Sequence, residues 1–139
     1  MQFYPAVVHI FKLKKLIKTN NTKLLIGSSF GGMLSYYLTE ELGIPCLLFN
    51  PAVAYQSVKV EIPEIKNKIC PLRIVVLGEK DDTINPVENA KLFKQKERTS
   101  LSQKIITCSW LGHQIDLQTF DEMVFFALRN YSIWQLKNI

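Results

Sequence analysis

The sequence predicts an α/β protein, built on a parallel sheet of about four strands flanked by helices. Short apolar runs alternate with longer amphipathic segments along the 139 residues, and turn-forming residues follow most of the apolar runs. Alternation of this kind is typical of parallel sheets whose crossover helices cover both faces. The length suits one core, so we expect a single domain over residues 1–139.

The apolar runs and the amphipathic segments give the expected elements in chain order. The apolar runs predict strands over residues 24–26, 46–49, 73–77 and 104–108. The amphipathic segments predict helices over residues 5–18, 30–42, from 86 onward and 116–136.

Spacing and end signals support the helices. In the first, Ile10, Leu13 and Ile17 recur at helical spacing among lysines. The second is expected to stop at Gly43, because glycine is common just beyond a helix end. The third has Asn85 as its expected N-cap. The buried face of the last helix is predicted to be Phe120, Val124, Ala127, Leu128 and Tyr131.

The strand over residues 73–77 is the clearest, because it is rich in β-branched residues and ends at a glycine. In open parallel sheets, ligands bind beyond the carboxyl ends of the strands. The loops after Ile26, Phe49, Leu77 and Cys108 are therefore the first places to look for a functional site.

The loop after the first strand reads Gly27-Ser28-Ser29-Phe30-Gly31, which matches G-x-S-x-G. A nucleophilic serine in this motif sits on a sharp, strained turn between a strand and a helix. Gly27 and Gly31 are expected to leave room for neighbouring backbone, and the N–H of Phe30 to be an oxyanion-hole donor. A phosphate-binding turn is the alternative, but the chain lacks a P-loop lysine and G-x-G-x-x-G spacing.

Two further loops carry groups that would complete a catalytic triad. Asp81 follows the third strand and His113 follows the fourth, giving the order Ser, Asp, His that is typical of one hydrolase fold. Asp81 would hold the imidazole in one tautomer, and His113 would act as the base for Ser29. We expect Asp82 to have an ordinary turn role, and His9 to lie on the first helix away from the chemistry.

These residues give the chain a resemblance to the α/β-hydrolase superfamily and, within it, to the small YqiA-like esterases. The matching stretches are Leu25–Gly32, Leu48–Val53, Gly78–Asp81 and Gly112-His113. The resemblance runs from about Tyr4 to the end of the chain. It implies a serine hydrolase with Ser29, Asp81 and His113 as its triad, acting on small acyl esters or thioesters through an acyl-enzyme and without a cofactor.

The resemblance has one departure. Such hydrolases begin with strands ahead of the nucleophile, and one is followed by a His-Gly loop that supplies a second oxyanion donor. Here one expected helix precedes the strand, and no His-Gly pair precedes Ser29. We therefore expect a truncated α/β-hydrolase fold whose first strand forms an exposed apolar edge. A homodimer through that edge, shielding by the first helix and a lost gene start all remain open. The alternative function is a weak or inactive hydrolase remnant that acts as an interaction module.

Composition argues against several other classes. The net charge of +5 comes with lysine clusters on expected helices, which suit solvated helix faces better than a nucleic-acid site. Neither nucleic acid nor a membrane is therefore expected as a partner, since apolar stretches run to about eight residues where a membrane span needs ~20. No secretory signal is evident, so we expect a cytoplasmic location. Cys46, Cys70 and Cys108 are expected to be buried free thiols, and no metal site is predicted.

Overall fold

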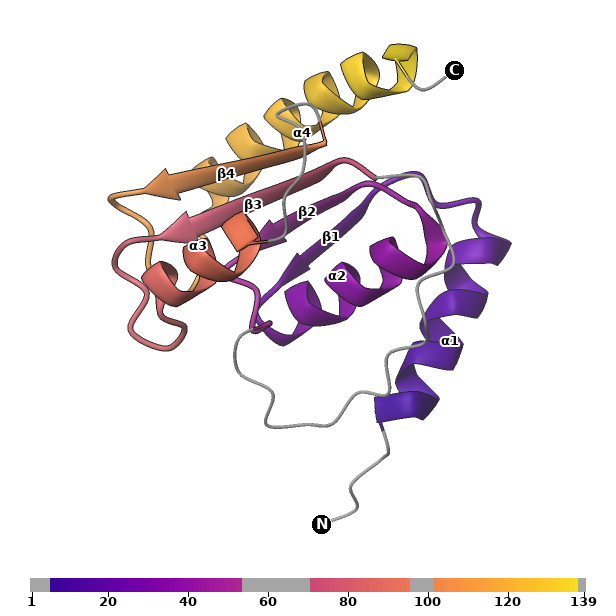
Figure 1. Cartoon of the computed structure of the whole chain (residues 1–139), viewed down its shortest axis with the longest axis horizontal. Helices are drawn as coiled ribbons and strands as arrows, with labels where there is room; N and C mark the ends of the chain where they lie inside the picture. Colours follow the sequence, from indigo (N-terminus) through magenta and orange to yellow (C-terminus); the bar gives the residue numbers. More distant parts are fainter. Residues whose placement is uncertain (1–5, 54–70, 96–101, 138–139) are drawn as a thin grey trace.

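The computed structural model describes residues 6–53, 71–95 and 102–137, with side chains from Ile10 onward. The strands are β1 (Leu25–Ser28), β2 (Cys46–Phe49), β3 (Arg73–Gly78) and β4 (Gln103–Cys108). The helices are α1 (Ala6–Thr19), α2 (Phe30–Leu42), α3 (Pro86–Gln95) and α4 (Leu117–Lys137) (Figure 1). Each of these elements lies where the sequence predicts it, with ends shifted by a few residues.

The strands form one parallel sheet in the order β1-β2-β3-β4, which confirms the predicted α/β fold class. The register is level across the sheet, with Leu25 beside Cys46, Cys46 beside Arg73, and Arg73 beside Gln103. The carboxyl ends of all four strands therefore lie along one edge. The loops that carry Ser29, Asp81 and His113 all begin at that edge.

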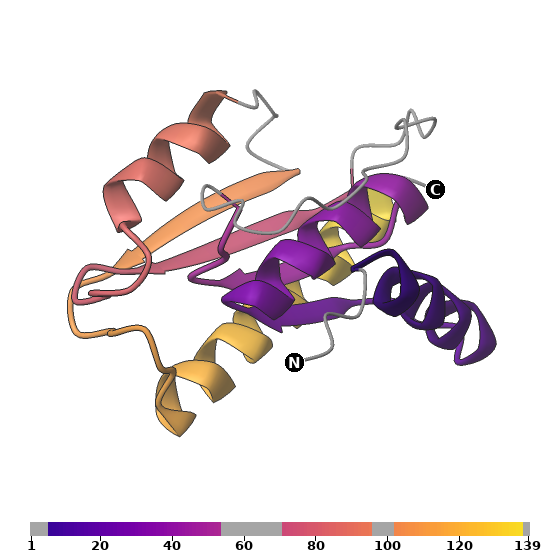
Figure 2. The ribbon, with the colours of Figure 1, turned by 90° about the horizontal axis from the view of Figure 1, so that it is seen from below.

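Helices cover both faces of the sheet, α2 and α3 on one side and α4 on the other (Figure 2). Successive strand residues point to opposite faces. Leu48 and Val75 thus pack toward α2 and α3, while Leu47 and Ile74 pack toward α4. All the residues of β2 and β3 are buried, which explains why these segments read as continuous apolar runs instead of alternating ones.

β1 lies at the edge of the sheet, and among the described residues β2 is its only neighbouring strand. Its Ile26 side chain remains 41% exposed, so the edge is apolar, as predicted. α1 lies beside α2 at this end of the sheet (Figure 1), where Ile10 and Ile17 form a small cluster with Leu38.

The predicted buried face of α4 is right at Phe120, Val124, Ala127 and Tyr131 and wrong at Leu128, which is half exposed. The fully buried Ala127 marks the centre of the face that meets the sheet, and the next residue is rotated by about 100° from it. Met123 and Trp134 complete the apolar face on its other side. Within the described ranges, no helix is both long enough and apolar enough to cross a membrane.

Candidate active site

Ser29 is the single residue at which the chain turns from β1 into α2. Its N–H donates to the carbonyl of Phe49 at 3.0 Å, and its own carbonyl accepts from Met33 at 3.0 Å to begin the helix. The turn forces φ to 54° and ψ to −118°, a conformation that costs an L-residue about 1–3 kcal/mol. A sharp, strained strand-to-helix turn is what the G-x-S-x-G motif predicts at this serine, and we call this turn, residues 27–31, the elbow.

The steric role expected for the two motif glycines holds at Gly27 only. A Cβ on Gly27 would lie 2.3 Å from the carbonyl oxygen of Gly31, so the strand and the helix approach too closely for any side chain. A Cβ on Gly31 would meet no described atom within 4 Å. The second close approach is instead at Gly32, where a Cβ would lie 3.0 Å from Cα of Pro51.

Phe30, the proposed oxyanion donor, is the first residue of α2. N–H groups in the first turn of a helix have no acceptor within the helix, so the Phe30 N–H is available to a ligand. The phenyl ring is 47% exposed and does not anchor the elbow. The assignment of this N–H to an oxyanion hole remains a prediction.

Asp81 has a buried carboxylate whose two oxygens have separate partners. Oδ1 accepts from the N–H groups of Thr83 at 2.8 Å and Ile84 at 2.9 Å, and Oδ2 lies 3.0 Å from Nδ1 of His113. The side chain of Asp82 is exposed and accepts from the Thr83 hydroxyl. The main turn role expected of Asp82 therefore belongs to Asp81, which also contacts the imidazole.

His113 lies in the loop after β4, next to the loop that carries Asp81. Backbone hydrogen bonds join the two loops, from Glu79 to the carbonyl of Cys108 and from Lys80 to that of Leu111, both at 3.0 Å. In a neutral ring, a contact of Nδ1 with a carboxylate favours the tautomer that carries its proton on Nδ1 and has Nε2 as the acceptor. The His113 side chain is 24% exposed, so part of it is accessible to solvent.

The structure brings Asp81 and His113 into contact, but it shows no hydrogen bond between the Ser29 hydroxyl and the His113 ring. Ser29 is connected indirectly to the loop that carries His113. Its carbonyl accepts from the N–H of Ala52 at 2.9 Å, and the side chain of Asn50, two residues earlier, donates to the carbonyls of Gly112 and His113.

Sequence reasoning missed Asn50 as a functional residue and used it only as part of the resemblance. It is 1% exposed and has a φ of 42°, in the left-handed region. A polar residue next to proline, directly after a buried strand, was the available signal.

Cys108 is the last residue of β4, just before the loop that carries His113. Burial raises the pKa of its thiol, and the carboxylates of Asp116, Glu122 and Glu79 raise it further. The thiol therefore stays protonated and unreactive at neutral pH. Cys46 and Cys108 are buried and free, as predicted, while Cys70 lies outside the described residues. Nowhere in the described ranges do three His, Cys, Asp or Glu side chains gather as metal ligands.

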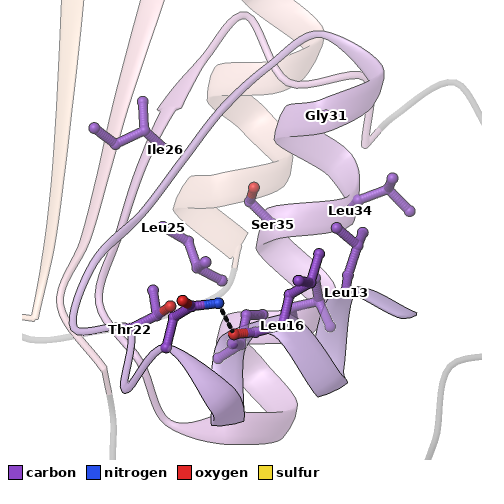
Figure 3. Close-up of a pocket in the computed structure, with 11 residues that line it drawn as sticks. Leu13, Leu16, Thr22, Leu25, Ile26, Gly31, Leu34 and Ser35 are labelled. Atoms are coloured by element: carbon purple, nitrogen blue, oxygen red, sulfur yellow. Dashed lines mark hydrogen bonds between the residues drawn. The ribbon is translucent and has the colours of Figure 1, made fainter. Parts of the chain in front are cut away.

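A groove of about 550 Å³ runs beside β1 (Figure 3). Figure 3 shows Leu13 and Leu16 of α1 facing Leu34 of α2, with Leu25 and Ile26 of β1 alongside. The lining is mostly apolar, and neither Ser29 nor any other residue of the proposed triad contributes to it. The groove and the polar cluster at the sheet edge are therefore separate features.

Comparison with known proteins gives a family match. No curated protein matches the chain, but the model of the Uncharacterised protein family (UPF0227) matches residues 5–104. The matched segment includes the Ser29 elbow and the Asp81 loop, while His113 lies beyond it. Because the match covers well over half of the sequence, the chain belongs to the Uncharacterised protein family (UPF0227).

Proposed function

We propose that this protein is a serine hydrolase that cleaves small acyl esters or thioesters. In this mechanism Nε2 of His113 removes the proton from the Ser29 hydroxyl, whose oxygen attacks the acyl carbonyl. The imidazolium then protonates the leaving alcohol or thiol, which departs and leaves an acyl-enzyme. Water, deprotonated by the same imidazole, hydrolyses that ester and restores Ser29.

The observation that carries this proposal is the contact of His113 with Asp81 at the sheet edge where the Ser29 elbow begins. A buried carboxylate held by two backbone N–H groups keeps a fixed position beside the ring. It would orient the imidazole and stabilise the imidazolium that forms during attack. Turn formation alone would employ Oδ1 and leave Oδ2 without a role.

The missing contact between Ser29 and His113 is compatible with this role, because catalytic hydrogen bonds are often long in structures without substrate and tighten in the complex. The elbow also provides the Phe30 N–H for the developing oxyanion. One such donor contributes about 2.7–4 kcal/mol, or roughly 10²–10³ in rate. With one donor assigned, we expect turnover below that of hydrolases with two.

A fluorophosphonate probe tests the proposal, since it reacts covalently with activated serines. We expect stoichiometric labelling of the folded protein, lost in Ser29→Ala and retained in Ser28→Ala. Ser28 is the matched control because it is the exposed neighbour of Ser29 at the end of β1. Folded protein that shows no labelling dependent on Ser29 would contradict the serine-hydrolase function.

The second candidate function is an interaction module, and the open edge of β1 is the observation that favours it. Leu25 and Ser29 donate their N–H groups toward β2 and its flanking residues. The backbone groups of successive strand residues point in alternate directions, so those of Ile26 and Ser28 point away from β2, and no other strand in the described ranges pairs with them. We propose a second copy of this chain as the partner, because two such edges can pair antiparallel about a two-fold axis and close the assembly.

Light scattering over a range of concentrations tests this pairing. We expect a dimer for the native chain, and a monomer for Ile26→Pro, which removes an outward N–H at the edge. Ile26→Val keeps that N–H and should remain dimeric. A monomer at every concentration would contradict the module, as would Ser29 labelling at a rate ordinary for serine hydrolases.

A further inference from the structure

The side chain of Asn50 connects the loops that carry Asp81 and His113. Its Oδ1 accepts from the N–H of Gly78 at 2.8 Å, and Gly78 is the last residue before the loop that carries Asp81. Its Nδ2 donates to the carbonyls of Gly112 at 2.9 Å and His113 at 3.3 Å. Both ends of the carboxamide are used, and the side chain is almost fully buried, so neither an apolar nor a purely accepting side chain could replace it.

The backbone around Asn50 is fixed on several sides. The Asn50 N–H donates to the carbonyl of Val76 at 2.9 Å, and the carbonyl of Pro51 accepts from Nδ2 of Asn89 at 2.8 Å. The N–H of Ala52 donates to the carbonyl of Ser29 at 2.9 Å. The segment 50–52 therefore contacts the elbow through the backbone of Ala52, and the loop that carries His113 through the side chain of Asn50.

We infer that Asn50 is a positioning residue for His113, which sets the imidazole relative to both Asp81 and Ser29. The inference rests on the proposed hydrolase function. Asn50 holds the peptide carbonyl of His113 itself, so a change in this contact moves the residue that bears the ring. A misplacement of about 1 Å in a catalytic group is enough to lower a rate roughly 10²-fold.

The backbone conformation of Asn50 offers a way to separate this role from a purely structural one. A φ of 42° suits glycine as well as asparagine. Asn50→Gly would therefore keep the turn and remove the carboxamide. Asn50→Asp would keep the shape and the acceptor for Gly78 but place a carboxylate against two carbonyl oxygens. The matched control is Asn85→Asp, because Asn85 is exposed and its Oδ1, which aspartate keeps, caps α3.

The test has one readout that depends on activity and one that does not. In hydrolysis of a p-nitrophenyl ester we expect kcat to fall about 10²-fold in both Asn50 variants with KM little changed, as a positioning role predicts. The second readout is the His113 tautomer, measured by ¹⁵N correlation spectra of the imidazole. The chain has only two histidines, so His9 is an internal reference.

We expect neutral His113 to carry its proton on Nδ1 in the native protein and in Asn85→Asp, and to become a tautomer mixture in both Asn50 variants. Folded Asn50 variants with an unchanged His113 tautomer would overturn the inference, and so would failure of both to fold, which would make Asn50 a requirement of the fold itself. Absence of ester hydrolysis in the native protein would contradict the proposed function alone, because the tautomer comparison would still decide the role of Asn50.

Discussion

Oδ2 of Asp81 lies 3.0 Å from Nδ1 of His113, although 32 residues separate them in the sequence. The sheet explains this proximity. β3 and β4 are parallel neighbours whose last residues, Gly78 and Cys108, are paired in register. The two loops therefore leave the sheet side by side, and two backbone hydrogen bonds between them fix the spacing at which a carboxylate can meet an imidazole.

This contact predicts a large effect of Asp81→Asn on ester hydrolysis. The amide would offer an N–H where the ring presents its own, and so would favour the wrong tautomer of His113. We expect kcat to fall by roughly 10³–10⁴-fold with the fold retained, as for the loss of an orienting acid. Asp82→Asn is the control, because Asp82 is exposed and makes no contact with the ring. Equal rates in the two variants would remove Asp81 from the mechanism.

The two glycines of the elbow motif should respond differently to alanine. In Gly27→Ala the new methyl group would overlap the Gly31 carbonyl and the Ser35 hydroxyl, at 2.3 and 2.5 Å. We expect a loss of stability of about 1–3 kcal/mol from this overpacking. In Gly31→Ala the methyl group would enter open space on α2, and a stability equal to or above that of the native chain is expected. Urea unfolding followed by circular dichroism measures both, and a larger loss in Gly31→Ala would contradict the elbow geometry.

Local sequence patterns were sufficient for the elements and for the three loops of the site. The spacing of apolar residues and the residues that begin or end a helix are local features of the sequence. A parallel sheet then brings the carboxyl ends of all its strands to one edge. Contacts between elements that are distant in the sequence could not be predicted from such local patterns. The need for a glycine at position 32 depends on Pro51, and the exposure of Leu128 depends on how α4 is rotated over the sheet.

Arg73 is the clearest case of such a distant contact. Arginine side chains are mostly exposed in folded proteins, yet that of Arg73 is 1% exposed. Its Nη1 lies 2.7 Å from Oε1 of Glu40, and its Nε 2.7 Å from Oε1 of Gln103. The guanidinium also lies over the rings of Tyr36 and Phe93, 5.0 and 5.1 Å from their centroids. These partners come from three separate elements, α2, α3 and β4.

Burial of this ion pair predicts that Glu40→Ala is strongly destabilising. The change removes a carboxylate that lies against a buried guanidinium, for which we expect a loss of about 3–5 kcal/mol in the free energy of unfolding. Glu41 on the same helix is the control. Its pair with Lys14 is more exposed, with side chains 21% and 25% exposed, so Glu41→Ala should cost about 0–1 kcal/mol. Similar losses in the two variants, measured by urea unfolding, would show that the buried pair contributes no more than the exposed one.

Asp116 at the start of α4 predicts a dependence of stability on pH. Its carboxylate accepts from the Thr119 hydroxyl at 2.7 Å and from the Thr119 N–H at 3.0 Å. The hydroxyl contact is the larger cause, and together they lower the pKa of Asp116 below its ordinary value of 3.8. A lowered pKa in the folded state means that the ionised cap stabilises the fold at pH values above 3.8. That contribution is lost as the pH falls from 3.8 through the lower pKa of the folded state.

We therefore expect Asp116→Ala to unfold at a lower urea concentration than the native chain at pH 7 and pH 5, and the difference to shrink as the pH falls below 3.8. Comparison of the two chains at each pH cancels the titration of every other group. Asp116→Asn is the control, because asparagine caps a helix equally well without ionising, so its advantage over alanine should persist in acid. Added salt should reduce the native advantage, since the carboxylate is exposed and screened. If the difference between the native chain and Asp116→Ala is as large at pH 3 as at pH 7, the ionised carboxylate is not the group that stabilises α4.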